Sequence, residues 1–192
     1  MDWAAFLSYV LVSCITPGPN TMISMSGGLQ RGFRYTLRYS SGVFLGFLAV
    51  SLLAALAGAL LYGFLPAAEP WLLALGAAYI LYLAWRVWRS SPDAPDGGGA
   101  YRGVLSGVAM QFINVKGVLF ALTAMASYVL PHFREPLAIA LISTLMAACC
   151  FVCCCLWALF GSVFEGLYRR HTKAVNAVMA LALAFCAVSL LL

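Results

Sequence analysis

Thr16-Pro17-Gly18-Pro19-Asn20 interrupts an apolar run that extends over residues 3–29. Two prolines remove two backbone donors and clash with the preceding turn, and the glycine adds backbone freedom, so we expect the helix to break here. Pro17 follows Trp3 by 14 residues, which is about 21 Å along a helix and close to the middle of a bilayer. A broken backbone is tolerated at that depth only beside protein or a water-filled cavity. The stretch therefore predicts a binding site rather than a loop.

The composition predicts an integral membrane protein. The chain has 192 residues, of which 64% are hydrophobic and 9% charged, whereas a soluble domain has about 25% charged residues. Six apolar runs approach or exceed the ~20 residues that cross a bilayer as a helix. They cover residues 3–29, 40–64, 69–88, 103–130, 136–163 and 174–192. Because the runs do not alternate as barrel strands do, we expect an all-α fold with six transmembrane helices.

The positive charges predict how these helices are oriented. Nine Lys and Arg residues lie in the connections after the first, third and fifth runs, whereas the other connections hold only Arg134. The positive-inside rule then places both termini outside the cytoplasm, and explains the net charge without a nucleic-acid partner. Residues 90–101 read as a cytoplasmic linker between two three-helix repeats, 1–89 and 102–192. Since three crossings is an odd number, the repeats are inverted, as in many transporters.

A second irregular stretch, Gln111-Phe112-Ile113-Asn114-Val115-Lys116-Gly117, lies on the fourth run. Its lysine sits near mid-membrane, where an ionisable side chain is costly and is by default a functional candidate. The alternative is a structural lysine that binds carbonyls freed by the break at Pro17. Because both irregular stretches fall at the same depth, we expect two interrupted helices to meet at a midplane site.

The cysteines and the paired glycines have simpler interpretations. Five of the seven cysteines lie on the fifth run: Cys149, Cys150, Cys153, Cys154 and Cys155. Cysteine packs as a small apolar residue, so we expect packing and no metal or cofactor. A thiol–disulfide conduit is the alternative, but the fourth run has no cysteine to pair with Cys14. The pairs Gly42/Gly46 and Gly103/Gly107 favour packing within one subunit, with a homodimer seam as the alternative.

Four groups of residues resemble the LysE/RhtB family of amino-acid exporters. They are Thr16-Pro17-Gly18-Pro19-Asn20; Gly32 and Arg34 with Gly42 and Gly46; the run Gly76-Ala77-Ala78-Tyr79-Ile80-Leu81-Tyr82-Leu83-Ala84-Trp85; and Gln111-Phe112-Ile113-Asn114-Val115-Lys116. The resemblance covers nearly the whole chain and is nearest to the cysteine/O-acetylserine exporter branch. Many family members have proline where Val115 stands, so we expect a less sharp break in the fourth crossing than in the first.

The resemblance implies a multi-pass protein of the bacterial inner membrane with periplasmic termini. It also implies a transporter, not an enzyme, that exports a small zwitterionic amino acid in exchange for protons. Cysteine, O-acetylserine, threonine and homoserine all suit such a site, and a passive channel is the further alternative. The candidate substrate-binding residues, from the motifs and the resemblance together, are Pro17, Gly18, Pro19, Asn20, Tyr79, Gln111, Asn114 and Lys116.

Overall fold

The computed structural model describes residues 1–16, 18–57, 103–164, 166 and 170–191, and ten residues between 74 and 89. All regular secondary structure in these residues is helical, which confirms the predicted all-α class. Two helices, α3 (Phe33–Ala57) and α7 (Pro136–Val163), are long and apolar enough to cross a membrane. Most of the predicted third crossing and the whole linker 90–101 lie outside the described residues.

The first predicted crossing is broken where the prolines predict. Helix α1 (Trp3–Ile15) begins after Asp2, whose carboxylate accepts hydrogen bonds from the first turn, and ends at Thr16. Helix α2 (Pro19–Arg31) has proline as its first residue, a position where no intrahelical N–H is lost. A single residue, Gly32, then connects α2 to α3 with φ +81°, a backbone conformation that favours glycine.

The predicted fourth crossing is also interrupted. Helices α5 (Gly103–Ile113) and α6 (Val115–Ala124) meet at Asn114, and a π-helical turn, η3 (Met125–Val129), continues α6. The chain bends by 68° at this break, and the bent pair is apolar enough to form one crossing. A sharp break therefore exists without a proline at residue 115. Helix α9 (Thr172–Leu191) completes the described helices.

Hydropathy located most helix ends but not the start of α3. The predicted runs 103–130 and 136–163 agree with the observed helices, whereas α3 begins at Phe33 rather than at residue 40. The additional turns contain Arg34 and Arg38. Arginine is a good helix former, so hydropathy marked where the apolar part of the helix begins and not where the helix itself begins.

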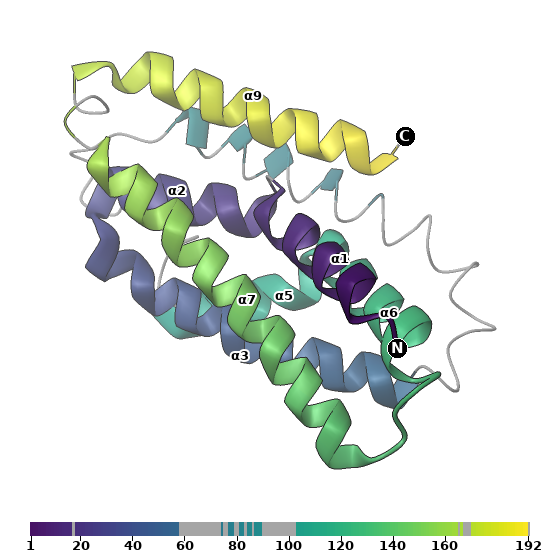
Figure 1. Ribbon diagram of the computed structural model, residues 1–192. Helices are drawn as coiled ribbons and strands as arrows, with labels where there is room; N and C mark the ends of the chain where they lie inside the picture. Colours follow the sequence, from purple (N-terminus) through teal and green to yellow (C-terminus); the bar gives the residue numbers. More distant parts are fainter. Residues whose placement is uncertain are drawn as a thin grey trace.

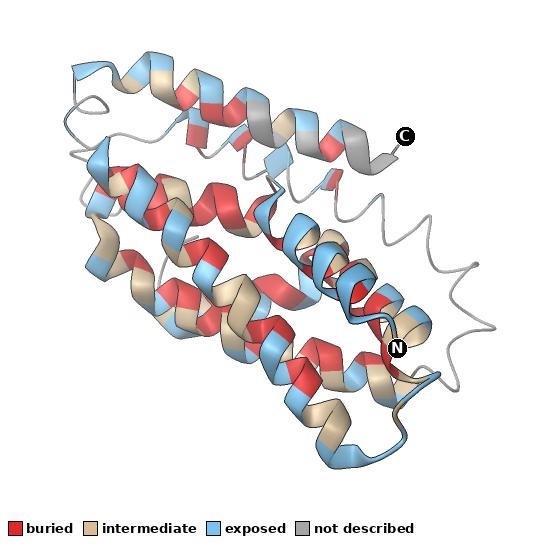
Figure 2. Cartoon of the chain, viewed as in Figure 1, coloured by how far each residue is buried: buried red, intermediate tan, exposed pale blue. Residues whose placement is uncertain are grey.

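Helix α2 is buried among three other helices. It contacts α3, α7 and α9, and Figure 1 shows α7 and α9 passing on either side of it. Most of its residues are buried in Figure 2, polar ones included. Glycines make the close contact with α7 possible: a Cβ on Gly28 would lie 2.1 Å from the carbonyl oxygen of Ala158, and one on Gly161 would lie 2.2 Å from that of Met25.

Glycines also set the contact between α3 and α5. A Cβ on Gly42 would lie 2.0 Å from the carbonyl oxygen of Val104, and one on Gly107 would lie 2.3 Å from that of Tyr39. The predicted packing of these glycines within one subunit is therefore confirmed. Gly103 does not share in it, because open space surrounds its Cβ position.

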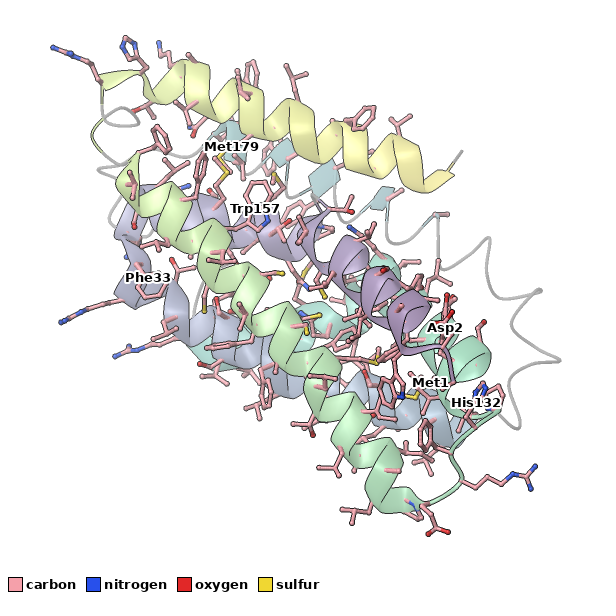
Figure 3. The ribbon with its side chains drawn as sticks, in the orientation of Figure 1. Met1, Asp2, Phe33, His132, Trp157 and Met179 are labelled. Carbon is pink, nitrogen blue, oxygen red and sulfur yellow. The ribbon has the colours of Figure 1, made fainter. Side chains whose placement is uncertain are left out.

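The N-terminal end of α1 and the connection between η3 and α7 lie together at one end of the molecule. Figure 3 places Met1 and Asp2 beside His132 of the connection between η3 and α7, and the ring centroids of Trp3 and Phe133 are 6.1 Å apart. The α2–α3 turn and the end of α7 lie at the opposite end of the molecule in Figure 1. The N-terminus and the 130–135 connection are thus on the same side.

Candidate functional site

Lys116 joins the two broken helices. It lies in the first turn of α6, and its ammonium donates a hydrogen bond of 2.9 Å to the carbonyl oxygen of Thr16 at the end of α1. The last carbonyls of a helix have no intrahelical partner, so the break supplies the acceptor. The lysine side chain covers Gly18, where a Cβ would lie 3.1 Å from Cδ and 3.2 Å from Nζ. Glycine therefore leaves the space that the lysine occupies.

The start of α2 is fixed by its own side chains. The hydroxyl of Thr21 accepts a hydrogen bond from the N–H of Gly18, at 2.9 Å, and donates one to the carbonyl of the same glycine, at 3.0 Å. These bonds hold the residue against which Lys116 packs. The first turn of α2 is thus presented to the lysine in a defined position.

A pair of amides forms the second connection between the breaks. Nδ2 of Asn20 donates to Oε1 of Gln111 at 2.8 Å, and Nε2 of Gln111 donates back to Oδ1 of Asn20 at 3.1 Å. The same Oδ1 accepts from the hydroxyl of Tyr39 at 3.3 Å, and Gln111 also donates to the carbonyl of Gly107 at 3.0 Å. The pair links α2, α3 and α5. Each amide thus donates a hydrogen bond through its nitrogen and accepts one at its oxygen.

Asn114 stands between α5 and α6 with an unused acceptor. Its backbone has φ −77° and ψ 89°, which ends the α-helical path, yet its side chain makes no capping hydrogen bond. The residue is 4% exposed, and its Oδ1 accepts no hydrogen bond from any described residue. A buried acceptor left without a donor costs about 1–3 kcal/mol. Such an atom is available to a ligand that brings a donor.

These groups surround a cavity of about 40 Å³. Its lining includes the polar groups of Thr16, Asn114 and Lys116 with the backbone of Gly18. It also includes apolar or thiol side chains, among them Cys14, Phe47, Phe120, Cys150 and Cys154. The volume holds water but is well below the roughly 300–1,000 Å³ of typical ligand pockets. A ligand larger than water requires the walls to separate.

A thiol pair lies in the same wall. The sulfurs of Cys14 on α1 and Cys150 on α7 are 3.4 Å apart. The sequence argument against a thiol conduit considered only the fourth crossing, which has no cysteine, whereas the thiol next to Cys14 comes from the fifth. Sequence spacing could not reveal this contact, because 136 residues separate the two cysteines.

The structure describes six of the eight candidate residues and brings all six together. Five of them line the cavity: Gly18, Pro19, Asn20, Asn114 and Lys116. Gln111 contacts Asn20 instead. Pro17 and Tyr79 lie outside the described residues. A role in substrate binding stays a prediction for all eight.

Sequence reasoning missed the wall residues Thr16, Cys14, Phe47, Phe120 and Cys150. Thr16 and Cys14 had a usable signal, because both lie within one helical turn of Pro17. The two phenylalanines had none, since nothing in their sequence context separates them from other apolar positions on a membrane helix.

Comparison with known proteins places the chain in a family. Residues 11–192 match the family described as LysE type translocator. The chain is 35% identical over 188 residues to a cysteine/O-acetylserine efflux protein of Klebsiella pneumoniae, covering 96% of this chain and 94% of that protein. It is 38% identical over 186 residues to the protein of the same name from Escherichia coli K12, covering 96% and 95%. No solved structure matches the chain. The protein therefore belongs to the LysE family of translocators.

Proposed function

We propose that the protein is a secondary active exporter of small neutral amino acids, which binds its substrate where the two broken helices meet. One observation carries the proposal: the Lys116 ammonium lies 2.9 Å from the Thr16 carbonyl oxygen, beside a cavity with both polar and apolar walls. The names of the relatives, which are efflux proteins, support export as the direction of transport. A transporter releases its substrate unchanged, so we propose no enzymatic activity.

The Lys116 ammonium and the start of α2 form the proposed subsite for the substrate carboxylate. Because the lysine packs against Gly18, the N-cap of α2, the ammonium and the helix N-terminus face the same space. A helix N-terminus carries partial positive charge and N–H groups without intrahelical acceptors. A carboxylate bound there replaces the Thr16 carbonyl as the partner of Lys116.

Two oxygens form the proposed subsite for the substrate ammonium. One is Oδ1 of Asn114, which accepts no hydrogen bond from a described residue. The other is the carbonyl of Thr16, at the negative end of α1, which becomes free when Lys116 turns to the carboxylate. The two charged ends of the substrate thus exchange partners with groups that the protein already holds in place.

The remaining wall suits a small, soft side chain. Phe47, Phe120 and the cysteines of the cavity offer apolar and polarizable surface. We therefore propose cysteine and O-acetylserine as the first substrates to test, with threonine and homoserine as the next.

Asn20 and Gln111 take a bracing role in this proposal. The Asn20 oxygen accepts hydrogen bonds from Gln111 and Tyr39, and the Gln111 oxygen accepts one from Asn20, so the protein holds both amides in place. Pro19 opens α2 and supports the carboxylate subsite. Pro17 and Tyr79 complete the proposed site on sequence grounds alone.

Alternating access follows from the size of the cavity. An amino acid cannot enter about 40 Å³, so the walls must separate toward one side of the membrane at a time. We propose two inverted three-helix repeats, residues 1–89 and 102–192 joined by the linker 90–101, that rock about the site. The six helices then lie in the bacterial inner membrane with both termini periplasmic. The equivalent breaks at Pro17–Pro19 and Asn114 support this arrangement.

Proton exchange is the proposed coupling. Inward movement of protons favours one of the two conformations, while Lys116 keeps its positive charge for the substrate carboxylate. Flux of O-acetylserine into proteoliposomes should rise when a pH gradient is imposed. A flux that is the same with and without the pH gradient contradicts proton coupling but not amino-acid transport. Failure to accumulate substrate against its own concentration gradient indicates a passive channel.

The decisive test replaces the lysine at the break. We expect Lys116→Gln to abolish efflux of every amino acid that the wild type exports from cells, because the uncharged side chain cannot bind a carboxylate. Lys173→Gln, which changes the exposed lysine at the start of α9, is the matched control and should export normally. Membrane content of each variant is measured in parallel. Full efflux by Lys116→Gln contradicts the proposed site.

A further inference from the structure

Two thiols from different helices are in contact in the wall of the cavity, and the proposed transport cycle makes no use of their redox chemistry. The sulfurs of Cys14 on α1 and Cys150 on α7 are 3.4 Å apart, and both residues line the cavity. Both are free thiols. We propose that this pair is a modification site: a small disulfide, such as the oxidised form of an amino thiol, converts it to a reversible Cys14–Cys150 disulfide that locks the transporter closed.

The geometry selects this pair among the cysteines of α7. The sulfurs of a disulfide are about 2.05 Å apart, so Cys14 and Cys150 must approach by about 1.4 Å. Cys153 also lies near Cys14, but it faces a separate apolar hollow with Leu156, Trp157 and Phe160. A reagent that enters while the walls are apart therefore reaches Cys14, and Cys150 returns to it when the walls close.

Lys116 makes Cys14 the first thiol to react. Lys116 and Cys14 line the same cavity, and a nearby cation stabilises a thiolate, which is the nucleophile. The Cys14 thiolate attacks one sulfur of the small disulfide RSSR, forms the mixed disulfide with R, and releases RS⁻, which takes up a proton.

The second thiol then closes the bond. Cys150 loses its proton and attacks the Cys14 sulfur of the mixed disulfide, which releases the second RSH. Two thiols of the protein are oxidised and one RSSR is reduced to two RSH, so two electrons pass from the protein to the reagent. Excess thiol drives the same steps in reverse.

The bond would stop transport because it joins two walls that must separate. The cavity of about 40 Å³ admits an amino acid only if α1 and α7 move apart or turn. A disulfide holds them together two residues from Thr16, whose carbonyl binds Lys116. This consequence rests on the proposed transport function, whereas the pairing of the two cysteines does not.

The test uses the full-length protein in proteoliposomes treated with cystine, which is then removed. Cross-linked peptides are identified by mass spectrometry, and uptake is measured with O-acetylserine, which has no thiol and cannot reduce the bond. We expect a Cys14–Cys150 peptide, a loss of uptake to the level of protein-free liposomes, and full recovery with dithiothreitol.

Two variants separate this pair from the other thiols. Cys14→Ser, which removes the thiol that reacts first, should keep its own untreated rate after cystine, whereas Cys155→Ser, which removes a cysteine of α7 outside the cavity wall, should still be inhibited. Absence of the Cys14–Cys150 peptide in treated wild type, or uptake that continues despite it, overturns the proposal. If untreated wild type does not take up O-acetylserine, the substrate proposal fails, while the peptide in the same sample still decides the pairing.

Discussion

The two breaks that meet at Lys116 differ in what causes them. The first lies between α1 and α2, where two prolines remove backbone donors and prevent a continuous helix. The second lies at Asn114, which no proline accompanies, yet the helix bends there by 68°. The prolines at the first break explain why the helix ends there, but no proline explains the second break.

Tertiary contacts explain the second break. Asn114 keeps its backbone bonds on both sides, with its N–H donating to Met110 at 2.8 Å and its carbonyl accepting from Val118 at 3.0 Å, but its side chain caps neither helix. The groups that flank it are instead held by the first break, through Lys116 to Thr16 and Gln111 to Asn20. The break between α1 and α2 is therefore encoded by the local sequence. The break at Asn114 depends on packing against the first one.

The largest effect is expected from filling the space beside the first break. In Gly18→Val the new side chain occupies the position of the Lys116 Cδ and Nζ atoms, which lie 3.1 and 3.2 Å from a Cβ there. The ammonium is displaced from both breaks, and we expect uptake of O-acetylserine to fall roughly tenfold or more, since each 1.4 kcal/mol of lost binding is a factor of ten. Initial uptake rates in proteoliposomes measure it.

The matched control for that substitution is Gly166→Val. Nothing lies within 4 Å of a Cβ at Gly166, so a valine there should leave uptake unchanged. Equal rates for Gly18→Val and wild type would show that Lys116 does not need its observed position.

The next effect concerns the scaffold of the second break. In Gly107→Ala the new methyl group lies 2.3 Å from the Tyr39 carbonyl oxygen and 2.8 Å from the Gly42 Cα, and backbone atoms cannot move aside without separating α3 from α5. Overpacking of this kind costs about 1–3 kcal/mol. Thermal unfolding in detergent, followed with a thiol-reactive dye, should occur at a lower temperature. Gly166→Ala should unfold like wild type, and a Gly107→Ala protein that does the same contradicts the tight contact.

The comparison also explains how much of the site the sequence could predict. Prolines and a mid-membrane lysine are signals that act at known positions on a helix. The sequence could therefore predict the break at Pro17–Pro19, the irregular stretch around Asn114 and the meeting of the two at Lys116. The expectation that the second break is less sharp than the first stays a prediction, although the 68° bend shows that a break forms there without a proline. A bend held by packing leaves no local signature.

Contacts between helices distant in sequence were not predictable for the same reason. The Asn20–Gln111 amide pair and the Cys14–Cys150 contact depend on how far each helix is rotated, and hydropathy does not fix rotation where a helix is apolar on all sides. Helix α2 is a further case, because its serines and threonine indicate an exposed face, whereas α3, α7 and α9 bury them. In α2, the polar side chains therefore lie in the protein interior, near the site.

A smaller effect is expected where the second break offers its unused oxygen. Asn114→Ala removes an acceptor that makes no hydrogen bond with a described residue, so the unfolding temperature should stay the same or rise. The proposed bond to the substrate ammonium is lost, and hydrogen bonds to charged groups contribute about 1.5 kcal/mol or more. We therefore expect the half-saturating O-acetylserine concentration to increase roughly tenfold. A lowered unfolding temperature with unchanged half-saturation indicates a purely structural asparagine.

The smallest effect measures how strongly the two breaks are coupled. Asn20→Ala and Gln111→Ala each leave a buried amide without its partner, whereas the double variant removes both. Hydrogen bonds between membrane helices contribute about 0.6 kcal/mol on average and at most about 1.7 kcal/mol. Because this pair is bonded twice and Gln111 is buried, we expect a coupling energy in the upper part of that range, measured from reversible unfolding in mixed micelles.

A second double-mutant cycle, which combines Asn20→Ala with Gln30→Ala, provides the reference for the coupling energy between Asn20 and Gln111. Gln30 bonds to Ser26 within α2 and does not take part in either break, so these two effects should add independently. Coupling between Asn20 and Gln111 no larger than this reference would mean that the amide pair does not hold the second break. Lys116 would then be the sole link from the first break to the second, and the bend at Asn114 should persist only while the Lys116–Thr16 bond does.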